Sequence, residues 1–288
     1  MSRLQLAVGA FLWVLACGLS HGQDRKPPPP PPLDVPALGQ APNPFPACIG
    51  CPKPFDFANH KLVLQDLASN AYIAELRRAL YWQDTYHQFE SRAHFDNCDF
   101  DGANAYLDQL LAEVDGHVDS ARQSKAKGDA GGAEASMRKA FFALGQALHA
   151  VQDFFAHSDY VERTKDTVKR EADLPVLAPW RAADRTKLKA MRADGLVSGR
   201  VWWGEPKHCP GDSLSHEALA KDNAGTRSGS VKVPHFRNRT QHEVAVFLAR
   251  EASVLLMQDA FRRWPLMKEM NGSNVAFEVF IDRREHRQ

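Results

Sequence analysis

The chain has 288 residues, 44% of them hydrophobic, with 36 lysines and arginines against 35 aspartates and glutamates. A net charge of +1 excludes the strongly basic footprint of a dedicated nucleic-acid-binding protein. The apolar share excludes wholesale disorder, because a chain of this length can bury a core. The unusual feature is the 12 histidines, whose spacing decides whether they form a site.

The first 22 residues predict a secretory signal peptide. A basic start at Arg3 precedes an almost wholly apolar stretch at 4–19, and the small residues Ser20 and Gly22 fit cleavage after position 22. This stretch is too short for a membrane helix, which needs about 18 apolar residues, and no later stretch reaches that length. We expect a secreted or periplasmic protein. The alternative is a lipoprotein signal, in which Cys17 anchors the chain to a membrane.

Residues 23–54 predict a proline-rich linker. The segment holds most of the chain's 18 prolines, including the unbroken run at 27–32. Such a run favours an extended polyproline II conformation without a packed core. We therefore expect a semi-rigid spacer in front of the folded domain.

Four cysteines remain besides Cys17, and an even number in an oxidising compartment favours two disulfides. Four cysteines allow three pairings. The most local of them joins Cys48 to Cys51 and leaves Cys98 with Cys209. A zinc or redox site at Cys48-x-x-Cys51 is the alternative.

Residues 55–270 predict a single, mainly α domain with long ordered loops. Apolar residues recur at helical spacing, most clearly at 133–161 and at 241–264. The second of these helices has Thr240 as its expected N-cap and Pro265 as its expected stop.

The remaining segments are less regular. A helical stripe runs through 62–80, and residues 194–239 are rich in Gly, Ser, Pro and His, which predicts an ordered loop. A C-terminal tail at 271–288 contains a short alternating segment at 275–281 that could form one strand.

The long helix predicted at 133–161 carries three candidate metal ligands. His149, Asp153 and His157 stand at i, i+4 and i+8, a spacing that drifts by only about 80° around an α-helix. Imidazole and carboxylate groups on one helix face are typical zinc ligands. An exposed polar stripe is the alternative, but Phe154 and Phe155 flank these residues and favour a partly buried cleft.

Other segments place histidines and carboxylates near expected helix starts or in loops, where ligands from separate elements can converge. These residues are His60, His94 with Asp96, His216 followed by Lys221-Asp222, and His242 with Glu243.

The order of these segments resembles the zinc-dependent phospholipase C/P1 nuclease fold. It is most similar to the branch of the fungal heterokaryon-incompatibility protein HET-C and related bacterial secreted proteins. The resemblance covers roughly residues 56–262. It rests on His94-Phe95-Asp96, the block 147–158, Ser198-Gly199, the loop from Cys209 to His216, the stretch 219–222 and His242.

The resemblance implies an all-helical domain whose cleft holds one to three zinc ions and cleaves phosphate esters. His149 and Asp153 would be ligands, with Asp153 able to bridge two ions. The other implied ligands are His94 or Asp96 at the first site, His157, His216 and His242 at another, and His60 at a third.

Two departures from the family pattern affect the ligand set. A proline-rich arm precedes His60, whereas in the founding enzymes the mature N-terminus binds metal. Residue 246 is aliphatic here, where those enzymes carry a glutamate one turn after the last histidine, which leaves that ligand to Glu243, Asp222 or nothing.

These expectations lead to two hypotheses. The first is a secreted zinc phosphodiesterase, phospholipase C-like, that acts on phosphate esters such as phospholipids at a membrane surface. Asp96 and Asp153 are its candidate catalytic carboxylates, and Lys221 either stabilises phosphate charge or is solvated. Nucleic acid is a less expected substrate, because the near-neutral charge gives little electrostatic affinity for it.

The second hypothesis is a non-catalytic HET-C-like zinc scaffold with a role in interaction or incompatibility at the cell envelope.

Overall fold

The structure is a computed structural model that describes residues 57–64, 67–201, 208–210 and 214–272. The signal peptide, the linker, the Cys48/Cys51 pair and the strand-like tail at 275–281 lie outside the described residues. The helices are α1 (Phe57–Val63), α2 (Asn70–Tyr86), α3 (Ser91–His94), α4 (Phe100–Ala126), α5 (Ala130–His157), α6 (Tyr160–Thr164), α7 (Ala182–Ala193), α8 (His216–Leu219), α9 (Gln241–Arg263) and α10 (Pro265–Asn271). The 3₁₀ turns are η1 (Lys165–Thr167), η2 (Glu171–Asp173) and η3 (Pro234–Phe236), and the strands are β1 (Lys232–Val233) and β2 (Arg239–Thr240).

The mainly helical fold class is confirmed for the described part of the chain. Its two named strands have two residues each and pair antiparallel, with Lys232 opposite Thr240 and Val233 opposite Arg239. Among the described residues, no helix is both long and apolar enough to cross a membrane.

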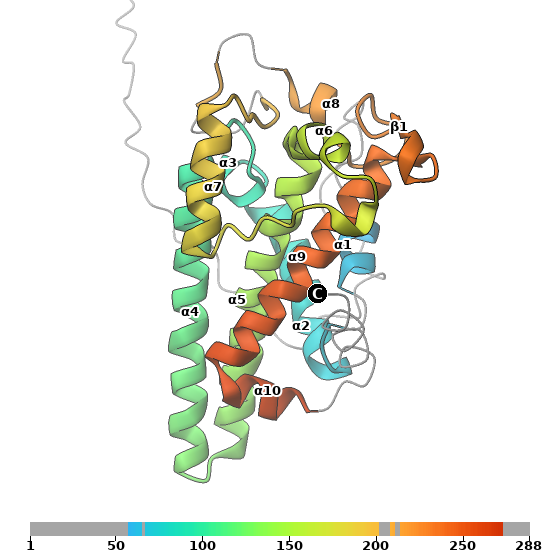
Figure 1. Cartoon of the computed structure of the whole chain (residues 1–288). Helices are drawn as coiled ribbons and strands as arrows, with labels where there is room; N and C mark the ends of the chain where they lie inside the picture. Colours follow the sequence, from blue (N-terminus) through green and yellow to red (C-terminus); the bar gives the residue numbers. More distant parts are fainter. Residues whose placement is uncertain (1–56, 65–66, 202–207, 211–213, 273–288) are drawn as a thin grey trace, which may run out of the picture. The chain divides into compact units, whose positions relative to one another are not determined.

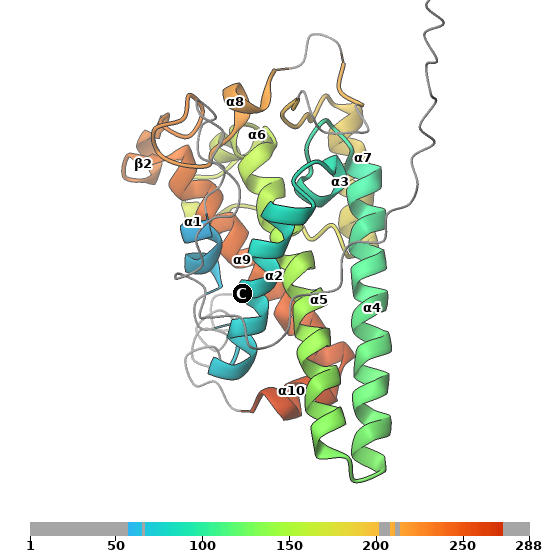
Figure 2. The same cartoon turned by 180° about the vertical axis from the view of Figure 1, so that it is seen from behind.

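Helix α5 is the centre of the packing. It forms an antiparallel hairpin with α4, while α9 lies against it on the side seen in Figure 1 and α2 on the side seen in Figure 2. Every residue from Ala140 to its end is buried. Gly145 permits the close approach of α2, since a Cβ at this position would lie 2.6 Å from the Cβ of Ala79. The C-terminal half of α5 therefore presents its polar side chains inside the protein.

Aspartate and threonine side chains begin the long helices. The carboxylate of Asp99 accepts from Gly102 N at the start of α4, and that of Asp129 accepts from Gly132 N at the start of α5. Thr240 caps α9 as predicted, in a capping box with Glu243. Pro265 follows the end of α9, but it also begins the next helix. It occupies the first turn of α10, where its missing N–H costs no hydrogen bond.

Helix α5 ends at His157, four residues before the end predicted at 161. Ser158 is extended, with φ −99° and ψ 165°, and it forms a β-bridge with Ser198. This pairing with a distant segment overrides the local periodicity, and the chain resumes a helix only in α6.

Other expected elements were altered by tertiary packing. The stripe at 62–80 is divided between α1 and α2, and Leu62 is 54% exposed although it belongs to the apolar pattern. The amphipathic helix α7 was not predicted. The loop expected at 194–239 is irregular, as predicted, apart from α8, η3 and the two short strands.

Candidate metal centre

Three groups of histidine and aspartate side chains lie around the C-terminal half of α5. Within each group, the ligand atoms lie within 4.8 Å of one another. The first group is His60, Asp84 and His149; the second is His94, His149 and Asp153; the third is Asp96, His157 and His216. Helices α1, α2, α3, α5 and α8 supply all of these residues except Asp96, which follows α3.

The three candidate ligands of α5 are all buried, which contradicts the exposed-stripe alternative. The helical spacing placed all three side chains on one helix face, and the resemblance implied that His149 and Asp153 serve one site and His157 another. The structure places His149 and Asp153 in the second group and His157 in the third. Two successive turns of one helix therefore serve different groups.

The second group has the dimensions of one face of a zinc coordination sphere. His94 Nδ1 and His149 Nε2 each lie 2.9 Å from Asp153 Oδ2, and the two nitrogens are 3.2 Å apart. Ligands at the usual zinc distances in a tetrahedral site are separated by about 3.3 Å. The three atoms could therefore contact one ion with only a small outward movement.

The first group extends this arrangement through a second oxygen of Asp153. His60 Nε2 lies 3.4 Å from Asp153 Oδ1, and the His60 ring stacks on His149 with 4.2 Å between centroids. Asp84 Oδ1 lies 3.5 Å from His149 Nε2. The carboxylate of Asp153 thus lies between the first and second groups, with one oxygen directed to each, as a bridging ligand requires.

Gln152 orients the ring of His60. The amide of Gln152 donates through Nε2 to Ser253 Oγ at 3.1 Å, so its Oε1 faces His60 Nδ1 at 2.6 Å. In this arrangement Nδ1 carries the proton and donates, and the lone pair of Nε2 is directed towards Asp153. Histidine ligands of metals are commonly held by such a donation from the other ring nitrogen.

Asp222 lies next to the third group. Asp96 Oδ1 lies 3.0 Å from His216 Nδ1 and 3.5 Å from His157 Nδ1. On the other side of the two rings, Asp222 lies 3.4 Å from His157 Nε2 and 3.5 Å from His216 Nε2. Asp222 is fully buried, and neither of its carboxylate oxygens has a well-formed hydrogen bond with the described residues. A buried carboxylate in this state fits a cation.

Asp96 is presented by a strained turn. Phe95, Asn97 and Cys98 all have positive φ values, 54°, 54° and 57°, although none is glycine. Such residues cost free energy and persist only where surrounding contacts hold them. Asn97 makes these contacts through its side chain, which donates to Ser91 Oγ at 2.7 Å and accepts from Val201 N at 2.8 Å.

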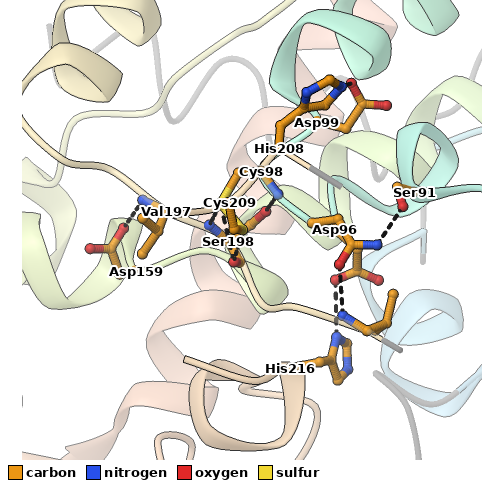
Figure 3. The surroundings of a disulfide bond; sticks show 12 residues. Ser91, Asp96, Cys98, Asp99, Asp159, Val197, Ser198, His208, Cys209 and His216 are labelled. Carbon is orange, nitrogen blue, oxygen red and sulfur yellow. Dashed lines mark hydrogen bonds and ion pairs between the residues drawn. A yellow bond between two sulfur atoms is a disulfide. The ribbon is translucent and has the colours of Figure 1, made fainter. Parts of the chain in front are cut away.

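The disulfide between Cys98 and Cys209 joins this turn to the loop that carries His216 (Figure 3). The predicted pairing of these two cysteines is confirmed, and it is consistent with an extracellular location. Gly199 lies in the same region, where a Cβ would come within 2.5 Å of the Cα of His216. The disulfide and this close approach together place His216 against Asp96.

The predicted ligands are thus brought together with one exception. His60, His94, Asp96, His149, Asp153, His157 and His216 belong to the three groups, whereas His242 belongs to none of them. The Nδ1 atom of His242 lies 2.8 Å from the carbonyl oxygen of Lys221. Lys221 is buried and its ammonium contacts Glu162, so it is not the solvated lysine of one sequence expectation.

Two site residues were missed or underused by the sequence interpretation. Asp84 lies in the last turn of α2, three residues before His87, but His87 belongs to none of the three groups, so this local spacing does not mark the site. Asp222 was noted after His216 and as one of two residues that could replace an absent glutamate, but it was not named as a ligand of a particular group. The sequence feature that pointed to Asp222 was its position directly after Lys221, in the stretch 219–222.

The charges of the first two groups are strongly coupled. Burial would raise the pKa of Asp153, but His149 and His157 outweigh it and hold this pKa well below its usual value. Burial would lower the pKa of His149, but Asp153 and Asp84 raise it above its ordinary value. Burial and His149 together lower the pKa of His60. Asp153 is therefore ionised and available as a ligand at neutral pH.

The third group holds protons on its histidines when no metal is bound. Burial would lower the pKa of His157, but Asp153 and Asp96 raise it to about 9. Burial would also lower the pKa of His216, but Asp96 and Asp222 raise this pKa well above its usual value. Burial would raise the pKa of Asp222, but His157 and His216 lower it to about 2.

We expect the metal-free and zinc-loaded proteins to respond to pH in opposite directions. The raised pKa of His157 stabilises the metal-free fold below pH 6.5, and this contribution is lost as the pH rises through about 9. Zinc requires neutral imidazoles, so its affinity increases over the same interval. Melting temperatures measured from pH 6.5 to 9 should fall in chelator and hold or rise in excess zinc. Parallel curves in the two conditions would contradict this linkage.

Comparison of the chain with protein-family models, curated proteins and solved structures finds no match.

Proposed function

We propose that the protein is an exported zinc-dependent phosphoric ester hydrolase, as its resemblance to the phospholipase C/P1 nuclease fold implies. The observation that carries this proposal is the position of Asp153 between two groups of potential ligands. A carboxylate with one oxygen directed to each group can hold two cations close together, which is the arrangement of many phosphoryl-transfer sites.

The charge balance of the site supports binding of more than one ion. Asp84, Asp96, Asp153 and Asp222 supply four carboxylates, whereas the histidines that ligate metal do so in the neutral form. Two divalent ions would balance the carboxylates, and a third would make the site positive. A positive site favours an anionic phosphate ester.

We assign different roles in the proposed reaction to Asp153 and Asp96. Bound zinc lowers the pKa of water and balances the charge that develops on phosphate. Asp153 is committed to its three histidine neighbours and acts as a ligand. Asp96 contacts both histidines of the third group through Oδ1, and we assign the second oxygen, Oδ2, to proton transfer.

The proposed substrate is a phosphate ester such as a phospholipid at a membrane surface. The net charge of +1 favours a small or lipid ester over a long polyanion such as DNA. We place the mature protein outside the cytoplasm, on the basis of the signal-like N-terminus and the Cys98–Cys209 disulfide. Retention through Cys17 is the alternative.

The second candidate function is a non-catalytic zinc scaffold, as the HET-C-like branch of the resemblance implies. Its support is the burial of the ligands, since His149, Asp153 and Asp222 are at most 1% exposed. Structural zinc sites are closed, whereas catalytic sites keep a position for water or substrate.

The two candidates differ in one measurement. The purified protein is expected to contain zinc and to hydrolyse a chromogenic phosphocholine diester, with activity lost in chelator and restored by added zinc. The rate and the zinc content should be measured on the same samples, with a nucleotide diester as the comparison substrate. Zinc without turnover on either ester would favour the scaffold, and a protein without metal would contradict both candidates.

A further inference from the structure

Lys221 is a lysine with 0% of its surface exposed. Its ammonium donates to the carbonyl oxygens of Ser158 at 2.8 Å and Leu219 at 2.9 Å. It also lies 3.1 Å from each carboxylate oxygen of Glu162. A buried ammonium requires this degree of compensation, because an unpaired charge in the interior is costly.

These contacts connect the two sides of the third group. Lys221 N donates to the carbonyl of Ala156 at 2.9 Å, and Lys221 Nζ binds the carbonyl of Ser158. These two carbonyls flank His157 in the chain, and Lys221 itself directly precedes Asp222. One residue therefore holds the backbone on both sides of His157 and the backbone next to Asp222.

The end of α5 explains why a cation is suited to this position. The last carbonyls of a helix have no partner within the helix and carry partial negative charge. In α5, the carbonyl of Ala156 is bound by Lys221 N and that of His157 by Gly199 N. The ammonium of Lys221 adds a positive charge at the same end, and Glu162 balances it.

We propose that buried Lys221 and its half-buried partner Glu162 form a positioning device that sets the separation of His157 and Asp222, and with it the metal affinity of the third group. This inference rests on the proposed function, because it assumes that the third group binds zinc. Neither residue is assigned a contact with the ion or with substrate. The pair acts through the backbone of residues 156–158 and 219–222.

The test is zinc binding by Lys221→Met and Glu162→Gln in the mature protein. Loss of a positioning contact around a metal ligand commonly weakens binding about 10- to 100-fold. We expect Lys221→Met to weaken one class of zinc site by about 100-fold and leave the other class unchanged. Glu162→Gln should weaken the same class by about 10-fold, since the amide keeps the shape but loses the charge.

Arg163→Met is the matched control. Arg163 is also a cation that binds a carboxylate and loop carbonyls, at Asp159, Asp194 and Gly195, but it contacts none of the three groups. We expect it to lower the melting temperature of the metal-free protein without changing either class of zinc affinity. Cobalt substitution adds a spectroscopic measurement, in which the absorption of one site should change in the Lys221 and Glu162 variants only.

Each outcome has a definite meaning. Unchanged zinc affinity in folded Lys221→Met or Glu162→Gln would overturn the inference, as would equal weakening by Arg163→Met. If Lys221→Met fails to fold, the zinc affinity of Glu162→Gln alone tests the inference. Failure of the proposed function is distinguishable: zinc binding without ester hydrolysis leaves this inference standing, whereas an unaltered protein that binds no zinc would overturn both.

Discussion

Replacing Asp153 by asparagine is expected to remove zinc from the first and second groups together. The change keeps the shape of the side chain but removes the charge that both groups share through its two oxygens. Zinc at about 1,000 times its dissociation constant contributes about 4 kcal/mol per site. For a domain of this size, loss of one such site lowers the melting temperature by roughly 10 °C, so loss of both should lower it by roughly 20 °C. The measurements are zinc content and calorimetry in excess zinc.

Asp119→Asn is the control for this experiment. Asp119 lies on α4, is 61% exposed and pairs with Arg122 at the surface, away from the three groups, so we expect no change in zinc content. Both variants should also be melted in chelator, where no zinc contribution exists. If Asp153→Asn retains the zinc content and melting temperature of the unaltered protein, Asp153 is not a bridging ligand.

Removal of the Cys98–Cys209 disulfide is the second large effect. The two cysteines are separated by 111 residues, and closing so long a loop restricts the unfolded chain strongly. The double variant Cys98→Ala/Cys209→Ala should therefore lose about 2–5 kcal/mol of stability. We also expect weaker zinc binding at the third group, because Asp96 and His216 lie on the two segments that the disulfide joins.

The second cysteine pair of the sequence is the control. Cys48 and Cys51 enclose only two residues, so their replacement by alanine should have little effect on the entropy of the unfolded chain. Equal melting temperatures for the Cys98/Cys209 variant and the unaltered protein would show that the disulfide is dispensable. Unchanged zinc binding in that variant would show that the hydrogen bonds of Asn97 suffice to hold the turn.

The sequence was most informative where local chemistry decides the structure. Helix α9 begins at Thr240 as predicted, because a capping box involves only residues three positions apart. The burial of His149, Asp153 and His157 was inferred from apolar neighbours on the same helix, and it is confirmed. These features depend on periodicity and on short-range hydrogen bonds.

The features that could not be predicted depend on distant segments. The end of α5 is set by the bridge between Ser158 and Ser198, which no local pattern announces. Asp84 reaches the site only because α2 packs closely on α5 at Gly145. The resemblance implied that one helix face is divided between two groups, but helical spacing alone did not, because the division depends on where α3 and α8 lie.

The backbone of the Phe95–Cys98 turn also escaped the sequence interpretation. Phenylalanine and cysteine rarely adopt positive φ, so residue type alone argued against this conformation. The hydrogen bond from Val201 N to Asn97 and the disulfide to Cys209 supply much of the compensation, and both come from a segment about 100 positions further along the chain. Strain of this kind is visible only in the folded molecule.

The distribution of the ligands along the chain has a consequence for biogenesis. Every residue of the first and second groups lies between positions 60 and 153, so these groups are complete in sequence once α5 has been synthesised. The third group and its disulfide require residues beyond 208, which emerge much later. A nascent chain that ends soon after α5 therefore contains all ligands for its first ions but only part of the set for the last. If the groups bind zinc as proposed, the first and second groups can take up ions before the third group and the Cys98–Cys209 disulfide are complete.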